Sequence, residues 1–202
     1  MIVIIDYGMG NVGSVKNALL FLKQEFLISN KMEDIAASSH LILPGVGAFG
    51  EGMGALEKFG LVEILGQQVL EKKKPFLGIC LGMELLAETG TEGGLHQGLG
   101  WVKGQVRRFQ IDEKIYPVPH IGWNDVRARQ ESVLFRDTEP NIFYFVHSYH
   151  FVLQEDAKAA MCEYGEPFVA AVEKNNIFGA QFHPEKSQKS GLRVLENFLS
   201  YA

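Results

Sequence analysis

The chain of 202 residues has only two cysteines, no excess of basic residues and no long uncharged apolar run. Two cysteines, Cys80 and Cys162, are too few for a disulfide framework, and neither belongs to a Cys-x-x-Cys pattern, so we expect a reducing, cytoplasmic setting and no metal site. No segment reaches the roughly 18 apolar residues of a membrane-spanning helix, which argues against a membrane protein. The formal net charge of −5 gives no overall attraction to nucleic acid.

The first half alternates short apolar runs with helical patterns. Apolar runs at residues 2–5, 40–43 and 76–79 have the character of strands buried on both faces, and a further strand is expected near residues 25–29. Helical spacing covers residues 12–22, 48–59 and 61–73, and a fourth helix of this half is expected to begin at residue 81 and to end by residue 90. This alternation predicts a doubly wound, mostly parallel sheet with helices on both faces.

The second half is richer in short β segments. We expect strands at residues 101–109, 142–153, 159–164, 168–174 and 177–182, which would add an antiparallel portion to the sheet. A closing amphipathic helix carries Leu192, Leu195, Phe198 and Leu199 on one face, with Ser187 or Ser190 as its cap. No linker divides the chain, so we predict a single three-layer α/β domain over residues 1–202.

Cys80 lies where the strand at 76–79 turns into a helix, within the pattern Gly78-x-Cys80-x-Gly82. This is a cysteine version of the nucleophile elbow, in which a strained residue projects from the end of a sheet. We expect the helix N-terminus to lower the pKa of the thiol and make it reactive. The structural alternative is a small buried core residue, the commoner fate of a free cysteine.

A base for this thiol is predicted at the far end of the chain. His183 follows the strand at 177–182, and Glu185, two residues on, is placed to orient its imidazole. His120, His147 and His150 compete for the role, but none has a carboxylate at such short range. Because His147 and His150 stand three apart on one expected strand, we expect them to point to opposite faces and not to form a metal pair.

An oxyanion hole is predicted at residues 44–47, Pro-Gly-Val-Gly, which follow another strand at the same sheet edge. Glycines let successive backbone N–H groups converge, so Val46 or Gly47 could stabilise a negative oxygen together with the N–H of Leu81. The structural alternative is a plain turn.

Gly8, Gly10 and Gly13 form a literal G-x-G-x-x-G after the first strand. A dinucleotide site would need an acidic residue about 20 positions further on, whereas the second strand ends in neutral Ser29 and Asn30. We interpret this loop as an exposed turn on the sheet edge where sites and partners assemble.

Together these motifs carry a family resemblance. The combination of Pro44-Gly-Val-Gly47, Gly78-Ile-Cys-Leu-Gly82 and Gln181-Phe-His-Pro-Glu185 resembles the class I, or triad, glutamine amidotransferases. Finer motifs resemble the glutaminase subunits of imidazole glycerol phosphate synthase, and the likeness runs from Ile2 to the last helix. These finer motifs are Asp6-Tyr-Gly-Met-Gly-Asn11, Pro119-His-Ile-Gly-Trp-Asn124, Tyr144-Phe-Val-His-Ser-Tyr149 and Phe182-His-Pro-Glu-Lys-Ser187.

The resemblance implies a flavodoxin-like fold and a cofactor-free glutaminase. Cys80 would form a glutamyl thioester, His183 would transfer protons and Glu185 would align it. The ammonia would pass to a (β/α)8-barrel subunit that makes imidazole glycerol phosphate and aminoimidazole carboxamide ribotide in histidine biosynthesis. The alternatives are a paralogue that feeds a sugar-modifying partner, a cysteine hydrolase on a similar sandwich, and a degenerate partner-binding subunit.

The same resemblance implies two further sets of residues. Substrate-binding residues would be Gly45, Glu84, His147, Ser148 and Tyr149. Residues at the partner interface would be Asn11, Trp123, Tyr144 and Lys186.

Glu84 departs from the family pattern, which usually has glutamine there. A carboxylate would repel the α-carboxylate of glutamine and place negative charge near the thiolate, so we expect Glu84→Gln to lower the KM for glutamine with little change in turnover. The glycines around Val46 would also let a peptide rotate between two arrangements, and we expect the isolated chain to be a poor glutaminase that the ligand-bound barrel activates.

Overall fold

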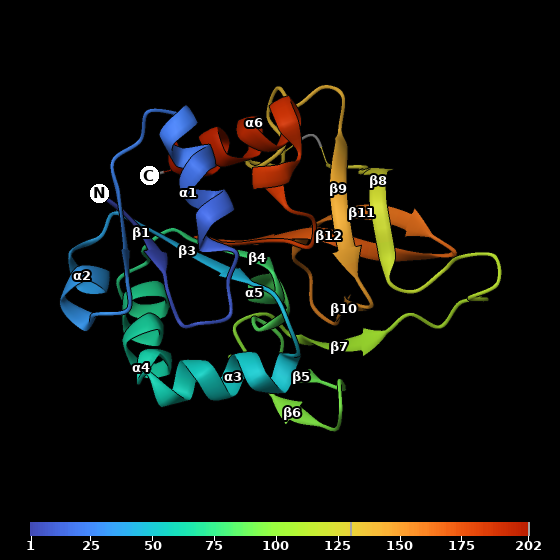
Figure 1. Ribbon diagram of the computed structural model, residues 1–202, viewed down its shortest axis with the longest axis horizontal. Coiled ribbons are helices and arrows are strands. Elements are labelled where there is room, and N and C mark those ends of the chain that lie inside the picture. The colour runs from blue at the N-terminus through green and yellow to red at the C-terminus, as the bar shows by residue number, and fades with distance from the viewer. Residues whose placement is uncertain (130, 202) are drawn as a thin grey trace.

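The computed structural model describes residues 1–129 and 131–201, so Gln130 and Ala202, which belong to the predicted 1–202 domain, lie outside it. A seven-stranded sheet forms the centre (Figure 1). Its strands in spatial order are β11 (Lys158–Tyr164), β12 (Glu166–Lys174), β13 (Ile177–Ala180), β4 (Phe76–Cys80), β3 (His40–Gly45), β1 (Ile2–Ile5) and β2 (Phe26–Ser29). The strands from β13 to β2 are parallel, and β12 and β11 add the expected antiparallel portion.

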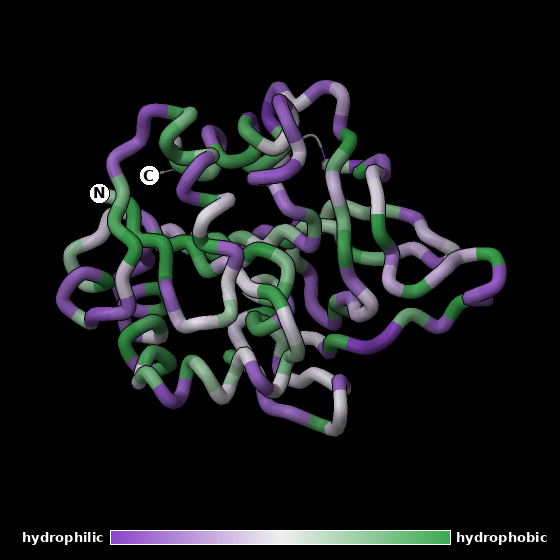
Figure 2. The backbone as a smooth tube through the Cα atoms, viewed as in Figure 1, coloured by the Kyte–Doolittle hydropathy of each residue, from purple (hydrophilic) through white to green (hydrophobic). Residues whose placement is uncertain are grey.

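The central strands are apolar because both faces of the sheet are covered. Successive residues of β1 alternate between two cores: Ile4 packs with one cluster and Ile5 with the other. The first core includes side chains of α1 (Val12–Phe21) and α6 (Gln188–Leu199). The second includes those of α2 (Met32–Ala37), α3 (Phe49–Lys58) and α4 (Leu61–Gly66), which continues as a π-helical segment, η1 (Gln67–Glu71). Figures 1 and 2 show these three layers, with hydrophobic strands between the helices.

Two smaller sheets are built from the middle of the chain. One has the order β10-β7-β5-β6, and the other pairs β8 with β9. Their bounds are β5 (Thr89–Gly90), β6 (His96–Gln97), β7 (Gly104–Arg108), β8 (His120–Asp125), β9 (Ile142–His147) and β10 (Tyr149–Leu153). Figure 1 shows β7 to β10 gathered on one side of the molecule, beyond the ends of β3 and β4.

The helix predicted after Cys80 is much shorter than expected. The observed α5 (Leu81–Glu84) is a single turn. The next carbonyls turn to another segment: Leu85 O accepts from Leu99 N, Leu86 O accepts from Trp101 N, both within 3.0 Å. Because these groups pair with residues 99–102, the helical ladder cannot continue toward residue 90.

The predicted strand at 142–153 is also wrong in one respect, because Ser148 divides it into β9 and β10. The strand expected at 101–109 is shorter, and α2 and β8 were not expected at all. No helix among the described residues has both the length and the apolar character needed to cross a bilayer.

Candidate active site

Cys80 ends β4 in the strained backbone turn that the sequence predicts. Its φ of 53° and ψ of −113° lie in a region that non-glycine residues rarely adopt, at a cost of about 1–3 kcal/mol. Gly82 makes the turn possible, because a Cβ there would overlap the carbonyl oxygen of Leu43 on β3. The elbow is therefore pressed against the neighbouring strand.

The pKa of the Cys80 thiol is raised, so the expectation of a lowered value is wrong for this conformation. Burial is the largest cause, and the nearby charge of Glu84 adds to it. The N–H of Leu81 bonds to the sulfur and acts in the opposite direction, but does not compensate. A one-turn helix has little macrodipole, and the side chain is only 7% exposed. The thiol therefore needs a base.

The register of two parallel strands brings the segment that carries His183 to the sheet edge of Cys80. Ala180 on β13 pairs with Ile79 on β4, so the segment after β13 reaches the sheet edge where Cys80 lies. The Nδ1 of His183 lies 2.8 Å from Oε1 of Glu185, and the two side chains are 2% and 1% exposed. Since a carboxylate only accepts, Nδ1 carries the proton and Nε2 has the free lone pair; Nε2 has no partner among the described residues.

The backbone of His183 is fastened to β9. His183 N donates to Tyr144 O at 2.9 Å, and the Ser187 hydroxyl donates to His183 O at 2.7 Å while accepting from Tyr144 N at 3.0 Å. Ser187 does occupy the N-cap position of α6, but its side chain makes no capping bond. Ser187 instead holds the backbone of His183 in place. His183 directly precedes the short helix η2 (Pro184–Lys186).

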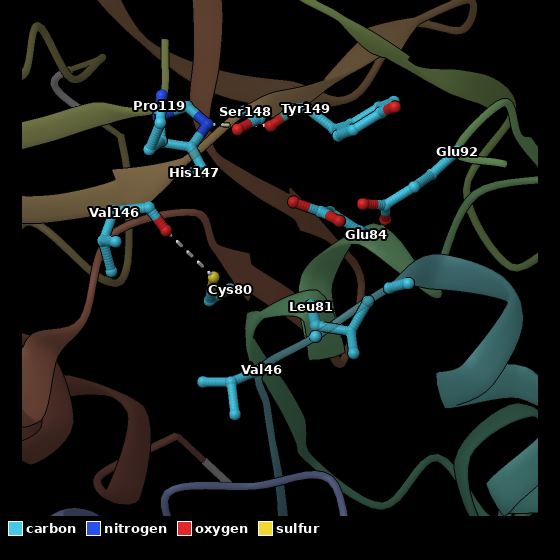
Figure 3. Close-up of a pocket in the computed structure, with 12 residues that line it drawn as sticks. Val46, Cys80, Leu81, Glu84, Glu92, Pro119, Val146, His147, Ser148 and Tyr149 are labelled. Atoms are coloured by element: carbon cyan, nitrogen blue, oxygen red, sulfur yellow. Dashed lines mark hydrogen bonds between the residues drawn. The ribbon is translucent and has the colours of Figure 1, made fainter.

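A cavity of about 410 Å³ opens at Cys80 (Figure 3). One wall holds the nucleophile, and β9 and β10 form the opposite wall, where Val146 O lies 4.0 Å from the Cys80 sulfur. Eight predicted site residues line the cavity: Val46, Gly47, Cys80, Leu81, Glu84, His147, Ser148 and Tyr149. Gly45, His183 and Glu185 are not among the lining residues.

The predicted oxyanion loop is in an arrangement that occupies one of its donors. Val46 N donates to Met9 O at 2.6 Å, so this N–H is already used by the loop that follows β1. Gly47 has a φ of 108°, a conformation that favours glycine and lets the adjoining peptides rotate at low cost. The rotation of a peptide between two donor arrangements stays a prediction, and a glycine at this position is compatible with it.

Glu84 is buried on the floor of the cavity. Its Oε1 accepts from Gln181 Nε2 at 2.8 Å. Burial raises the pKa of Glu84 to about 7; the bond from Gln181 lowers it and the charge of Glu92 raises it. At neutral pH the carboxyl group is thus divided between its two forms, which weakens the permanent repulsion expected from the sequence.

Two residues of the site were missed by the sequence. Glu92 also lines the cavity, and its Oε2 accepts from Phe49 N at 2.9 Å at the start of α3. The sequence analysis gave no signal for it. Tyr7 was noted only as part of the motif Asp6-Tyr-Gly-Met-Gly-Asn11. Its hydroxyl has no partner among the described residues and lies beneath Gly45, where a Cβ would come within 2.6 Å of it. Burial is the largest cause of a raised pKa for Tyr7, and the nearby charges of Cys80 and Glu84 add to it.

Three of the four predicted interface residues form one cluster beside His183. Trp123 on β8 pairs with Tyr144 on β9, their ring centroids 6.0 Å apart, and Lys186 Nζ lies 5.7 Å above the Tyr144 ring. Trp123 is 48% exposed. Asn11 instead caps α1, accepting from Ser14 N at 3.4 Å.

His147 and His150 do not lie on one strand, so the argument for opposite faces is wrong. Ser148 breaks the strand, and both rings pack on Phe109, with centroids 5.1 and 4.8 Å from it. His120 on β8 lies opposite His147 on β9, and their rings are in contact. Within the described part of the chain, no three His, Cys, Asp or Glu residues are grouped as a metal site would require.

Comparisons with known proteins show the family of the chain. The family model "Glutamine amidotransferase class-I" matches residues 3–201. The imidazole glycerol phosphate synthase subunit HisH 2 of Methanococcus maripaludis is 45% identical, covering all of both chains. Subunit HisH of Aquifex aeolicus is 47% identical over 97% of this chain and 94% of its own. A crystal structure described as a glutamine amidotransferase matches with a TM-score of 0.74 at 20% identity, covering 98% of this chain and 96% of that one, which supports the fold.

Proposed function

The chain belongs to the class-I glutamine amidotransferases, and within them to the HisH subunits of imidazole glycerol phosphate synthase, and from this premise we propose that Cys80, His183 and Glu185 release ammonia from glutamine. The observation that carries the proposal is the register of β13 on β4, which brings an unpartnered, oriented imidazole nitrogen to the edge where the strained thiol lies. The cavity at the thiol has room for one amino acid.

The reaction begins with proton transfer from the Cys80 thiol to His183 Nε2. The thiolate forms a C–S bond to the carboxamide carbon, and the carbonyl oxygen becomes an oxyanion. His183 returns the proton to the nitrogen, the C–N bond breaks and ammonia leaves a glutamyl thioester. His183 then takes a proton from water as the water oxygen bonds to the thioester carbon; the C–S bond breaks, glutamate leaves, and His183 returns the proton to the sulfur of Cys80. Throughout, Glu185 accepts the Nδ1 proton as a hydrogen bond and stabilises the imidazolium.

Leu81, Val46 and Gly47 supply the oxyanion donors in this scheme. The N–H of Leu81 is already at the sulfur, whereas that of Val46 must leave Met9 O before it can help. Gly45, Glu84, His147, Ser148 and Tyr149 hold the amino-acid end of glutamine. Because one donor is occupied at rest, the isolated chain is a slow glutaminase that its partner activates.

As a synthase subunit the chain has a partner subunit, and we propose that this partner is the (β/α)8 barrel of histidine biosynthesis. Trp123, Tyr144 and Lys186 would contact it, because they form an exposed cluster beside His183, and Asn11 would join them from the start of α1. We propose further that residues 1–202 act as one cytoplasmic domain without a cofactor.

The test mixes the chain with purified candidate barrel subunits and measures glutamate release with and without the acceptor substrate. We expect slow release alone and faster release with the ligand-bound histidine-pathway barrel. Full activity of the isolated chain would contradict the control step, and activation only by a different, sugar-modifying system would favour the paralogous role. Failure of a glutamine-analogue electrophile to alkylate Cys80 would contradict the triad itself.

A further inference from the structure

Two imidazoles meet at the cavity wall formed by β9 and β10: His147 lines the cavity and His120 lies behind it, and the glutaminase scheme does not use their contact. His120 on β8 and His147 on β9 stand opposite each other in the antiparallel pair. Both are buried, with 2% and 6% exposure, and His120 Nδ1 lies 3.0 Å from His147 Nε2.

The hydrogen bonds around this pair fix which nitrogen carries each proton. His147 Nδ1 lies 2.7 Å from Tyr149 O, and since a carbonyl only accepts, Nδ1 must donate. His147 Nε2 is then the acceptor, so His120 donates from Nδ1. His120 Nε2 in turn faces the Asn124 amide nitrogen at 3.4 Å, and the same amide nitrogen donates to Glu163 O at 3.0 Å. The chain of donors therefore runs in one direction, from Asn124 to Tyr149 O.

We propose that His120 is a positioning residue which, acting through His147, holds the Ser148–Tyr149 bend in the shape that binds glutamine. The inference rests on the proposed function, because it takes this bend as the wall that receives the substrate. The bend lines the cavity opposite Cys80, and Figure 3 shows His147 bonded across Ser148 to Tyr149. Phe109 N donates to Ser148 O at 3.2 Å and fixes the other carbonyl of the bend.

Packing alone does not account for His120. Its ring stacks on Tyr164 at 4.0 Å and on Phe145 at 5.0 Å, which a phenylalanine would satisfy equally well. A phenylalanine would leave His147 Nε2 as a buried acceptor without a donor, which costs about as much as a lost hydrogen bond. His150 is the contrast: it is equally buried in the same aromatic cluster, but its Nε2 faces Glu166 Oε1 at 3.4 Å and not a residue of the bend.

The donor chain is intact only while both rings are neutral, since an added proton would set two N–H groups against each other. Burial lowers the pKa of His120 to about 4 and that of His147 to about 3. For His147, the bond to Tyr149 O raises the pKa, and repulsion from His120, His150 and His183 lowers it. The array is therefore complete across the neutral range.

His120 also ties the bend to the surface where a partner subunit would dock. Side chains of β8 alternate, so His120 points inward while Ile121 and Trp123, 60% and 48% exposed, point outward. A partner seated on these two side chains would press on the strand that carries the donor. Docking and glutamine binding are thus linked through one strand and one hydrogen bond.

The test compares three variants of the full chain, each assayed with the activating partner subunit. His120→Phe keeps the aromatic packing and removes the donor, and we expect the KM for glutamine to rise about tenfold with kcat changed less than about threefold. His120→Asn places an amide nitrogen where Nδ1 was, and should restore KM to within about threefold of the parent chain. His150→Phe is the matched control in the same cluster and should leave KM unchanged.

Two readouts separate positioning from mere structure. In His120→Phe the Nε2 of His147 can take up a proton, so the acid limb of kcat/KM should move to higher pH. In the unaltered chain, ¹⁵N NMR of the imidazoles should show His120 protonated at Nδ1 and bare at Nε2. Equal KM values for His120→Phe and His150→Phe, failure of His120→Asn to rescue, or the opposite His120 tautomer would each overturn the inference. Absence of glutamate release from the unaltered complex would instead overturn the proposed function.

Discussion

The two walls of the cavity are constructed differently. On one side, the backbone register of parallel strands places Cys80 and the segment that carries His183. Ile79, the residue before Cys80, pairs with Pro44 on β3 and with Ala180 on β13. On the other side, the Ser148 bend joins two small sheets and is held by the side chain of His147. In the nucleophile wall, strand register sets the backbone position of Cys80, and the side chains of Ser187 and Glu185 only hold and orient His183. The shape of the substrate wall depends instead on the side chain of His147. Under the proposed function, such a division would let the chemistry stay fixed while glutamine binding responds to a partner.

The largest expected effect comes from the nucleophile wall and is chemical. Cys80→Ala should lower the rate of glutamate release at least about 10³-fold, because the thioester cannot form. Partner binding and thermal stability should change little, since the register and not the thiol holds the wall. Cys162→Ala, at the other buried cysteine, is the control and should retain activity. Residual activity within tenfold of the parent chain would remove Cys80 from the mechanism.

The next effect tests whether the backbone truly sets this wall. Gly82→Ala should lower the free energy of unfolding by about 3 kcal/mol, because the new Cβ would overlap Leu43 O and force the elbow away from β3. Gly54→Ala on α3 meets no atom within 4 Å and should raise stability by about 0.5–1 kcal/mol. Urea unfolding of both variants measures the contrast, and equal stabilities would refute it.

A smaller effect is expected on the outer side of the substrate wall. Trp123→Ala should weaken partner binding by about 2 kcal/mol, or about 30-fold in Kd, if the cluster with Tyr144 is a central contact. Phe21→Ala is a matched control, since Phe21 is 72% exposed on α1. Titration calorimetry with the barrel subunit would compare the two. Identical affinities would exclude this face of β8 and β9 as the interface.

The smallest effect concerns the cavity floor between the walls. With a pKa of about 7, Glu84 is charged above neutral pH and neutral below it. Glu84→Gln imitates the neutral form, so it should lower the KM for glutamine by about threefold at pH 8 and little at pH 6. A pH-independent ratio of the two KM values would contradict a titrating Glu84.

The raised pKa of Glu84 also predicts how Glu84→Gln changes the free energy of unfolding with pH. The folded chain holds the Glu84 proton more tightly than the unfolded chain, whose carboxyl has its ordinary pKa of 4.5. The carboxyl therefore destabilises the fold increasingly from about pH 4.5 to about pH 7 and fully above that. Glu84→Gln should gain unfolding free energy above pH 7 and none below pH 4. Glu57→Gln, exposed on α3, should show no such dependence.

The sequence predicted the nucleophile wall far better than the substrate wall. Runs such as 2–5 and 76–79 are apolar because the sheet is covered on both faces, so their composition alone reports their position. The early end of α5 and the break at Ser148 arise from bonds to segments distant in sequence, which no local pattern records. β8 was missed for the same reason, although its motif had been noted.

The candidate residues follow the same division. Cys80 and the His183–Glu185 pair could be found because each motif is local. The raised pKa of the thiol, the bond between Val46 N and Met9 O, and the contact of His120 with His147 depend on burial and on partners far along the chain. Sequence reasoning can name such residues, but their charge and orientation come from tertiary contacts.

The pairing of β4 with β13 also has a consequence during synthesis of the chain. Ribosomes deliver β4 long before β13, so the nascent chain carries a wholly apolar strand whose edge has no neighbour on that side. Under the proposed mechanism, Cys80 would have no base, and glutamine would not be consumed, until the segment from Ile177 to Glu185 emerges. An interrupted translation product would therefore lack the proposed activity and would expose an apolar strand edge to aggregation, so completion of β13 would serve both activity and solubility.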